Sequence, residues 1–388
     1  MKILYILNST LPLGGATKSF LILLDGIIGK GFSPIVVVPD ENGIYGQLRQ
    51  RGIHTICISF REATYPWTRN IRDYILFIPR IIGRIWLNRK AVAELQKRLK
   101  GEKIDMIHSN VSVIDIGYRL SRRFHVPHIY HIREFGDLDF NLHYFPSKNH
   151  FQKMLTAAES YSVCITQAIQ QHHQQASSPT SVVIYNGIHC PVYQRTDIDK
   201  KERNYFLFAG RVEPSKGLDI LLEAYSRYKG SKPLYIAGDY NIHSDYFKKI
   251  KNIIANNGLD DRVLLLGVRN DIEALMQKAL ALVVPSRFEA FGRSMAEAMF
   301  NECLVIGHNT GGTKEQFDNG HRFTSKEIGL RFSNTEELSD RLNEADTMQS
   351  SVYEEYIHNA LDTVNSLYST ESYIENICKF YYRITNGL

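Results

Sequence analysis

Short runs of apolar residues recur along the chain without the alternating polar positions of a half-exposed strand. Such runs, rich in Val, Ile, Tyr and Phe, are typical of parallel strands that are buried on both faces. In the first half of the chain they predict strands at 2–7, 34–38, 54–60, 106–109, 128–131, 162–166 and 182–185. Segments with helical patterning lie between them, among others at 16–28, 111–124 and 151–160. This alternation predicts an α/β domain with a doubly wound parallel sheet.

The alternation stops at a polar, charged segment that contains Pro191, and then starts again. We therefore expect a domain linker at 191–203, between an N-terminal domain at 1–190 and a C-terminal domain at 204–370. The second series predicts strands at 205–209, 234–237, 263–266, 282–285 and 304–307. Its helices are expected at 217–228, 243–257, 271–279 and 294–301, and the chain is helical beyond 334. The aromatic-rich segment 371–388 is expected to pack back on the first domain. Two doubly wound domains in tandem predict a cleft where the carboxyl ends of both sheets face each other.

Composition narrows the class of protein. The 388 residues are 44% hydrophobic and 22% charged, as in a soluble globular protein. A formal net charge of +5 is too small for a dedicated nucleic-acid binder. The five cysteines contain no C-x-x-C pair, which favours reduced thiols over a disulfide or zinc framework. The apolar run at 2–7 is too short for a signal sequence or a membrane span.

Three motifs at strand-to-helix junctions carry candidate chemistry. The first is Gly14-Gly15, where paired glycines let backbone amides approach an anion at the start of a helix. The alternative is a turn that merely needs glycine. The pattern is not G-x-G-x-x-G, so a dinucleotide site is not indicated.

The second motif is Gly210-Arg211 followed by Lys216-Gly217. It places two cations five residues apart at a strand exit and a helix entry. Arg211 offers forked hydrogen bonds and Lys216 a mobile point charge, so together they suit a diphosphate. The alternative is that both cations are solvated surface groups.

The third motif joins two carboxylates, Glu289 and Glu297, across a glycine loop that opens a helix. Glu297 is expected about one turn inside that helix, so both carboxylates can face one ligand. Free amides around Phe291–Arg293 suit hydroxyl or phosphate oxygens. Glu297 lies too far along the helix for a capping-box residue, which argues against simple helix capping.

Taken together, these motifs resemble the retaining glycosyltransferases of family 4, which have the GT-B fold of two Rossmann-like domains. The E-x7-E pattern of Glu289 and Glu297, the Gly-Arg…Lys-Gly element and Gly14-Gly15 occur in the expected order. Asn186-Gly187-Ile188 before the linker and Gly311-Gly312 after the E-x7-E helix also match. The resemblance spans most of the chain.

The resemblance implies a role for each matching residue. Arg211 and Lys216 look like the pair that neutralises the donor diphosphate, and Glu297 looks like the ligand of the ribose hydroxyls. Glu289 resembles the residue that holds the donor sugar. The other positions implied to contact the donor are Gly15, Gly210, Gly238, Val268, Ala290, Phe291 and Gly292.

In the first domain, His131 matches the family histidine that lies under the donor sugar. Its implied task is to orient a hydroxyl, or to stabilise the developing oxocarbenium charge through its backbone carbonyl; a histidine simply packed at a strand end is the alternative. Asn110, Arg133 and Glu134 are candidate acceptor contacts, although Arg133 and Glu134 could equally form a local ion pair. The loops at 133–148 are expected to determine the acceptor.

No protein nucleophile or base is evident, which fits a front-face mechanism that relies on positioning and electrostatic stabilisation. The 14 histidines form no metal motif, and the adjacent His172 and His173 would diverge on a helix. We therefore predict no essential metal and no cofactor, with a UDP-sugar or GDP-sugar as the substrate.

Charge is distributed unevenly along the chain. Residues 61–103 carry eleven Lys or Arg against four acids, and this +7 exceeds the +5 of the whole chain. Within this segment, large apolar residues alternate with arginines, which suits a helix on an anionic membrane surface through residues 74–100. The alternative is that Ile78, Ile81, Ile82 and Ile85 pack on the first sheet. Regularly spaced aromatic residues for stacking are lacking, which argues against nucleic acid.

The sequence thus predicts a cytoplasmic, metal-independent, retaining hexosyltransferase, either free or peripheral at the inner face of the membrane. It is expected to move a sugar from a nucleotide sugar to a glycan or lipid-linked acceptor in bacterial surface polysaccharide synthesis. The alternatives are a sugar-nucleotide epimerase on the same fold and a non-enzymatic sugar-nucleotide-binding subunit.

Overall fold

A computed structural model describes residues 1–12, 14–68, 70–189 and 200–386. The chain folds into two compact units: unit 1 consists of Met1–Gly187 with Thr370–Leu388, and unit 2 of Ile188–Ser369. Most of the predicted linker, residues 191–199, lies outside the described residues, and its last part forms a 3-10 turn at Lys200–Glu202. Four of the five cysteines are free thiols, while Cys190 lies outside the described part of the chain.

Unit 1 is built on a seven-stranded sheet of order β3-β2-β1-β4-β5-β6-β7, in which every pair is parallel. The strands are β1 (Lys2–Ile6), β2 (Ser33–Val38), β3 (His54–Cys57), β4 (Met106–Ser109), β5 (His128–Ile132), β6 (Ser160–Cys164) and β7 (Ser181–Val183). The strand order reverses between β1 and β4, which therefore form the topological switch point of this sheet.

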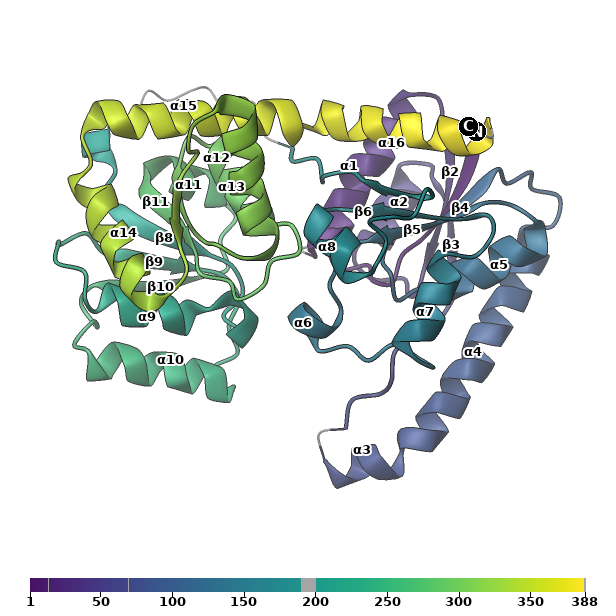
Figure 1. The fold of residues 1–388 in the computed structure, drawn as a ribbon. Coiled ribbons are helices and arrows are strands. Elements are labelled where there is room, and N and C mark those ends of the chain that lie inside the picture. Colours follow the sequence, from purple (N-terminus) through teal and green to yellow (C-terminus); the bar gives the residue numbers. More distant parts are fainter. Residues whose placement is uncertain (13, 69, 190–199, 387–388) are drawn as a thin grey trace. The chain divides into compact units, whose positions relative to one another are not determined.

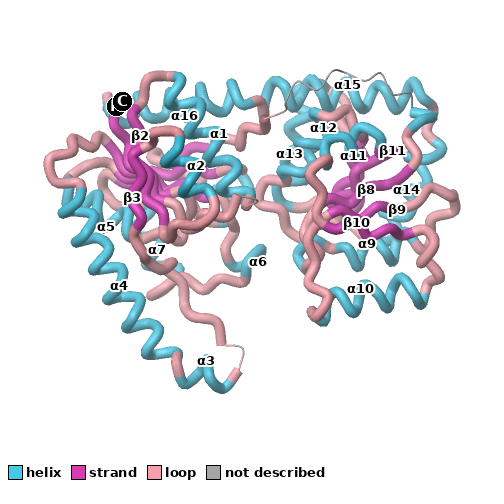
Figure 2. Tube along the Cα trace, turned by 180° about the vertical axis from the view of Figure 1, so that it is seen from behind, coloured by secondary structure: helices cyan, strands magenta, loops and turns pink. Residues whose placement is uncertain are grey.

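Helices cover both faces of this sheet (Figure 2). They are α1 (Gly15–Gly29), α2 (Ile44–Gln50), α3 (Ile71–Ile75), α4 (Phe77–Arg98), α5 (Ile116–Phe124), α6 (Asp137–Phe140), α7 (Lys148–Leu155), α8 (Gln167–His172) and α16 (Thr370–Thr385). The last of these comes from the far end of the chain, yet it packs along α1 in the same hydrophobic core (Figure 1). The contact is close, because a Cβ placed on Gly26 would lie 2.3 Å from Cγ1 of Ile374.

Unit 2 repeats the plan with a six-stranded sheet of order β10-β9-β8-β11-β12-β13, again parallel throughout. The strands are β8 (Tyr205–Ala209), β9 (Leu234–Ala237), β10 (Val263–Gly267), β11 (Ala279–Val284), β12 (Leu304–His308) and β13 (Leu330–Phe332). Here the order reverses between β8 and β11. The sequence-based prediction of two doubly wound α/β domains is confirmed.

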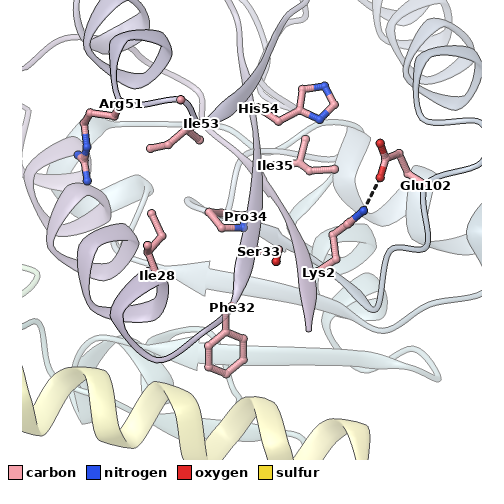
Figure 3. Close-up of a pocket in the computed structure, with 11 residues that line it drawn as sticks. Lys2, Ile28, Phe32, Ser33, Pro34, Ile35, Arg51, Ile53, His54 and Glu102 are labelled. Atoms are coloured by element: carbon pink, nitrogen blue, oxygen red, sulfur yellow. Dashed lines mark hydrogen bonds and ion pairs between the residues drawn. The ribbon is translucent and has the colours of Figure 1, made fainter.

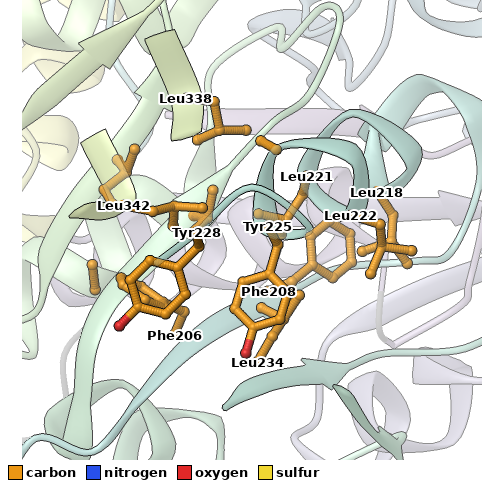
Figure 4. Close-up of a cluster of buried hydrophobic side chains, with 14 of the residues drawn as sticks. Phe206, Phe208, Leu218, Leu221, Leu222, Tyr225, Tyr228, Leu234, Leu338 and Leu342 are labelled. Carbon is orange, nitrogen blue, oxygen red and sulfur yellow. The ribbon is translucent and has the colours of Figure 1, made fainter. Parts of the chain in front are cut away.

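The helices of unit 2 enclose a core of aromatic and leucine side chains, part of which Figure 4 shows. They are α9 (Leu218–Tyr225), α10 (Asp245–Asn256), α11 (Ile272–Lys278), α12 (Arg293–Phe300), α13 (Gly311–Thr324), α14 (Thr335–Thr347) and α15 (Ser350–Leu367), with a 3-10 turn at Pro214–Lys216. In this core Phe206 packs edge-on against Tyr228 at 5.3 Å between ring centroids. Burial of such apolar side chains is the main stabilising term for each unit.

Several predicted boundaries are wrong for local reasons. The helix expected at 151–160 is α7, which starts earlier because the Ser147 side chain caps it and ends before β6 begins at Ser160. Thr166, expected in a strand, is instead the N-cap of α8 and accepts a hydrogen bond from Ile169 N. The helix expected at 111–124 starts only at Ile116. The pattern did not predict α13 or the three-residue strand β13.

Candidate active site

In unit 2, three predicted donor-contacting loops lie side by side at the carboxyl ends of β8, β9 and β10. The backbone N–H of Gly210 donates to Ala237 O at 2.9 Å, and that of Gly238 donates to Gly267 O at 2.8 Å. Gly238 has a φ of +154°, and a Cβ there would lie 1.9 Å from Gly210 O, so this approach requires glycine. Val268, in the third loop, is exposed.

Lys216 and Glu289 form an ion pair between two of the predicted motifs. Lys216 Nζ donates to Glu289 Oε1 at 2.6 Å, and the Ser286 hydroxyl donates to the same oxygen at 2.7 Å. Both side chains are partly buried, with 27% of Lys216 and 13% of Glu289 exposed. The second oxygen of Glu289 and two further donor positions of Lys216 lie outside this contact, so the pair can bind additional polar groups.

The two loops that carry this pair are also joined through backbone and side chains. Gly217 has a φ of +67°, and a Cβ there would lie 2.0 Å from Pro285 O. Next to it, Arg287 makes a forked contact with Asp219, at 3.1 and 2.9 Å. Burial alone would raise the pKa of Asp219, but hydrogen bonds from Arg287, Lys249 and Tyr246 lower it overall. The charge of Asp219 therefore fixes the 3-10 turn of Lys216 against the loop of Glu289.

The glycine loop before α12 presents backbone rather than side chains. Gly292 is the N-cap of α12 with a φ of +86°. The Phe291 ring is buried against Tyr368, at 5.5 Å between centroids, so its contribution to a ligand site is limited to its main chain. Gly312 N donates to Glu289 O at 2.6 Å, which ties the loop, including Ala290, to the start of α13.

Glu297 and Arg211 pair with residues other than Lys216 and Glu289. Glu297 is one turn inside α12, as expected, where it accepts a hydrogen bond from Arg293 at 3.2 Å. Arg211 is 60% exposed and pairs with Glu213 at 3.1 Å. Glu297 and Arg211 are thus each paired with a neighbour in the sequence, whereas Lys216 and Glu289 pair across two motifs.

In unit 1, the predicted residues gather at the switch point between β1 and β4. Asn110 follows β4, and its N–H donates to Ile6 O at 2.9 Å. Its side-chain amide donates to Ala16 O at 3.3 Å, in the first turn of the helix that Gly15 begins. Ligands of open α/β sheets bind outside the carboxyl ends of strands at such a point.

Arg133 connects Asn110 to His131. Its Nε donates to Asn110 O at 3.0 Å, and its Nη2 lies 3.2 Å from His131 Nδ1. Nη1 donates to Asn186 Oδ1 at 2.6 Å, so the Asn-Gly-Ile motif belongs to the same network. All of these side chains are buried. The expected alternative of an Arg133–Glu134 ion pair is wrong, because only the backbone N–H of Arg133 contacts the carboxylate, at 3.2 Å.

The Glu134 carboxylate accepts from the backbone N–H of Ser112 at 2.8 Å, and from its hydroxyl at 2.5 Å. Burial raises the pKa of Glu134 to about 7, against the lowering effect of these hydrogen bonds. Glu134 is therefore a buried group of the loop that follows β5, whereas Arg133 and Asn110 belong to the network of His131.

Sequence reasoning missed the part of this network that comes from the far end of the chain. Tyr381, on α16, lies 2.7 Å from His108 Nδ1, and His108 Nε2 lies 3.1 Å from His131 Nδ1. Tyr373 on the same helix lies 3.5 Å from Arg133. The only sequence signal was the aromatic richness of this helix, which indicates packing and not a role at a site.

The prediction that no metal is needed overlooked an Asp-x-Asp spacing at Asp137–Asp139. The structure gives these two carboxylates different partners. Asp137 pairs with Lys148 at 3.1 Å and His172 at 2.6 Å, while Asp139 accepts from the backbone of Gly136 at 2.8 Å. Within the described residues, no group of three or more His, Cys, Asp or Glu is placed to hold a metal ion. A second such triplet, at 197–199, lies outside them.

Unit 1 has two cavities of interest. One, of about 370 Å³, lies at the amino ends of β1 and β2 beside the Lys2–Glu102 ion pair (Figure 3), away from the switch-point residues. The other has a volume of about 510 Å³. It is lined by Tyr65, Phe77 and a run of residues between Asp137 and Lys148, which belong to the loop expected to determine the acceptor. The rings of Tyr65 and Phe77 are stacked with centroids 5.8 Å apart.

Helices α3 and α4 expose large apolar side chains beside this second cavity. Ile75, Ile78, Ile82 and Trp86 follow one another at helical spacing and are 60–70% exposed. The alternative that Ile78, Ile81, Ile82 and Ile85 pack on the sheet is therefore wrong for Ile78 and Ile82, whereas Ile81 and Ile85 are partly buried. The buried face of α4 consists instead of Arg84, Asn88, Ala91, Val92 and Leu95. In the part of the chain that the structure describes, no helix is both long and apolar enough to cross a bilayer.

Two parallel, doubly wound units of this topology define the GT-B class, and solved structures of that fold match the chain over its whole length. A glycosyltransferase from Rickettsia africae has a TM-score of 0.78, 19% identity and coverage of 100% of this chain and 99% of that one. Anabaena HepE, solved with UDP and glucose, has a TM-score of 0.75 and 22% identity, with 98% of both chains covered. These similarities establish the fold.

Sequence comparison gives a family match for part of the chain. Residues 194–362 match the model of the family "Glycosyl transferases group 1". An Escherichia coli UDP-Gal:alpha-D-GlcNAc-diphosphoundecaprenol alpha-1,3-galactosyltransferase is 26% identical over 76% of this chain and 80% of its own length. An uncharacterized glycosyltransferase of Methanocaldococcus jannaschii is 29% identical over 63% of this chain and 70% of its own. The chain thus has the GT-B fold, and its residues 194–362 are similar to the group 1 glycosyltransferases.

Proposed function

We propose that this protein is a retaining, metal-independent hexosyltransferase that uses a nucleotide diphosphate sugar. The observation that carries this proposal is the Lys216–Glu289 ion pair, which joins a cation suited to a diphosphate with a carboxylate suited to sugar hydroxyls. Similarity to the Escherichia coli galactosyltransferase supports an activated sugar as the donor. UDP-sugars and GDP-sugars are the donors we expect.

In this proposal the residues of unit 2 bind the donor. Arg211, largely exposed, and Lys216 contact the diphosphate and stabilise its charge as the leaving group. Glu297 accepts hydrogen bonds from the ribose hydroxyls, and Glu289 from hydroxyls of the sugar. Backbone amides at Ala290, Phe291 and Gly292, at the start of α12, supply further donors. Gly210, Gly238 and Val268 surround the nucleoside.

The reaction we propose breaks the bond between the anomeric carbon and the diphosphate oxygen. The acceptor oxygen forms its bond to that carbon on the same face, and its proton passes to the departing diphosphate. No protein nucleophile takes part, so catalysis consists of orientation and charge stabilisation. In unit 1, the backbone amide of Gly15 donates a hydrogen bond to the phosphates, and His131 orients a hydroxyl of the donor sugar.

For the acceptor we propose a glycan or lipid-linked saccharide, in bacterial surface polysaccharide synthesis. The 510 Å³ cavity of unit 1 is lined by aromatic side chains and by the polar groups of Asp137 and Lys148, a composition suited to sugars. Relatives support this class of product, among them an O-antigen chain mannosyltransferase of Salmonella typhimurium, 29% identical over 41% of this chain.

We further propose that α3 and the first half of α4 lie on the surface of an anionic membrane, which places the protein at the inner face of the membrane. The exposed apolar stripe from Ile75 to Trp86 is flanked by exposed cations at Arg72, Arg80, Arg89 and Lys90. The acid between them, Asp73, pairs with Arg80 at 2.8 Å. Apolar side chains with a basic border are the pattern of helices that lie in the lipid headgroup region.

A panel of nucleotide sugars tests the proposed function. One nucleotide sugar should raise the melting temperature by several degrees, because ligands that bind only the folded state stabilise it. With that donor, mixed saccharide and lipid-linked acceptors should receive sugar with retained anomeric configuration in the presence of EDTA. Conversion of the donor without any transfer would favour the epimerase alternative. Binding without conversion would favour the non-enzymatic subunit.

A further inference from the structure

A row of four buried aromatic side chains crosses unit 1 from β1 to β5. Tyr5 and Tyr381 hydroxyls are 3.0 Å apart, Tyr381 OH lies 2.7 Å from His108 Nδ1, and His108 Nε2 lies 3.1 Å from His131 Nδ1. None of the four side chains is exposed. Since buried polar groups in contact must pair a donor with an acceptor, the positions of the protons along this row can be worked out from its ends.

Arg133 fixes the state of His131. Its guanidinium carries only donors, so at 3.2 Å from His131 Nδ1 it requires a lone pair on that nitrogen. A doubly protonated His131 would place N–H against N–H beside a fixed positive charge. His131 is therefore neutral with its proton on Nε2. The guanidinium of Arg133 is held in this orientation, because it also donates hydrogen bonds to the side-chain oxygens of Asn110 and Asn186 at 2.6 to 3.2 Å.

The state of His131 then fixes His108. With a lone pair on His131 Nδ1, His108 Nε2 must carry a proton, since two lone pairs would otherwise face each other at 3.1 Å. The remaining nitrogen, His108 Nδ1, accepts from the Tyr381 hydroxyl, which in turn accepts from Tyr5. Burial and the charge of Arg133 lower the pKa values of both histidines well below the ordinary range, in agreement with neutral rings.

We propose that Tyr381, His108 and Arg133 are positioning residues that hold His131 as a neutral imidazole with its proton on Nε2. This inference rests on the proposed function for the place of His131 beside the donor sugar. His131 Nε2 has no hydrogen-bond partner among the described residues. It is thus the one ring nitrogen of the pair with a proton left to offer. Because it is buried in this structure, it donates to an oxygen of the sugar only once that oxygen gains access to it. With Nδ1 engaged by two donors, His131 does not act as a base.

Nuclear magnetic resonance of the full chain with ¹⁵N-labelled histidine tests the proton positions directly. Ring nitrogens report which atom carries the proton, and His108→Gln and His131→Gln variants assign the two rings. At pH 7 both rings should show a protonated Nε2 and an unprotonated Nδ1. A proton on Nδ1 of His131, or a doubly protonated ring, would overturn the inference whatever the enzymatic activity.

Tyr381→Phe tests the far end of the row, because it removes the hydroxyl and keeps the ring. Without that donor, the buried His108 Nδ1 loses its partner and the ring is held less firmly against His131. We therefore expect kcat to fall about tenfold with an unchanged KM for the donor, as for loss of one hydrogen bond. Tyr382→Phe, at an exposed neighbouring position, is the matched control. A wild-type kcat in Tyr381→Phe would contradict the positioning role.

Activity and proton position separate this inference from the proposed function. If the rings have the expected protons but no nucleotide sugar is turned over, the proposed function fails and the assignment of the protons stands. If transfer proceeds normally in His131→Ala, the role of His131 toward the sugar is wrong, and with it the consequence drawn for Tyr381.

Discussion

The ammonium group of Lys216 lies 2.6 Å from Oε1 of Glu289, so two residues 73 positions apart in the sequence form one charged pair. The pair holds Lys216 in place while leaving the cation able to bind an anion. A diphosphate that approached it would find a lysine already oriented. This arrangement leads to the first prediction.

Lys216→Ala should lower kcat by about 10²- to 10³-fold, because a cation that stabilises the leaving group is lost where charge develops. Glu289→Gln should also lower kcat, since Lys216 loses its counter-charge. Initial rates with the donor found in the thermal-shift panel measure both effects. The matched control is Glu336→Gln, which breaks an exposed ion pair with Arg227 and should keep the wild-type rate. An unchanged rate in Lys216→Ala would argue against its role at the diphosphate.

Glu297→Ala should weaken nucleotide binding by about 10- to 100-fold, the cost of losing hydrogen bonds to a charged group. Isothermal titration with UDP and GDP measures the change. Because Glu297 is partly exposed and its only described ion pair is with Arg293, stability should change little. Glu354→Ala, on the exposed side of α15, is the control. Equal affinity in the Glu297 variant and the wild type would remove Glu297 from the proposed ribose site.

The wild-type protein should sediment with phosphatidylglycerol vesicles at low salt and dissociate as salt is added. Replacing Ile75, Ile78 and Ile82 together by serine should reduce binding at least tenfold, because each loses about 1.5 kcal/mol or more of apolar burial. Replacing Ile242 and Val352 by serine, at exposed positions elsewhere, should not.

Absence of sedimentation at low salt would refute membrane association. Analytical ultracentrifugation tests the alternative that the exposed apolar side chains of α3 and α4 are covered by a second copy of the protein. A dimer that the triple substitution dissociates, without vesicle binding, would identify a second copy as the occupant.

The free energy of unfolding should fall as the pH is lowered from 7 to 5. Burial lowers the pKa of His128 to about 3 and that of His173 to about 4. Below about pH 6.5 the unfolded chain binds protons that the folded protein excludes, so each histidine reduces stability by up to about 1.4 kcal/mol per pH unit. Glu134 acts in the opposite direction, because its raised pKa of about 7 lets the folded state bind the extra proton.

Urea unfolding of His128→Gln at pH 7, 6 and 5 checks the histidine contribution. The variant should show a shallower dependence of the unfolding free energy on pH than the wild type. His150→Gln replaces an exposed histidine and should retain the wild-type dependence. A slope in His128→Gln as steep as in the wild type would mean that His128 is protonated in the folded state.

The sequence predicted those parts of the fold that depend on local pattern. Apolar runs predicted β1 and β8 correctly, because a buried parallel strand appears in the sequence as a continuous apolar run and can be identified without knowing its neighbours in the sheet. The pattern missed α13, whose polar segment contains Gly311, Gly312 and Gly320 and has little helical preference of its own. Contacts within unit 2 hold it, including Gln316 donating to Gly292 O at 3.1 Å.

The residues of the site likewise fall into those that a local motif indicates and those that only the packing of the fold brings together. Motif spacing indicated Lys216 and Glu289 separately, but their pairing depends on loops brought together by Asp219 and Arg287. Tyr381 has no motif at all. Its relation to His108, 273 positions away, depends on how α16 packs along α1 and could not be inferred from local sequence.

The docking of α16 on α1 also has a consequence for how the protein is made. Unit 1 consists of two stretches of chain with all of unit 2 between them. On the ribosome, its first stretch emerges with the apolar face of α1 uncovered and His108 without the Tyr381 hydroxyl. Because domains fold as units during synthesis, unit 2 can complete its core before unit 1 does. Unit 1, whose synthesis begins first, therefore completes its folding last, and the apolar face of α1 is the surface that chaperones would have to protect until then.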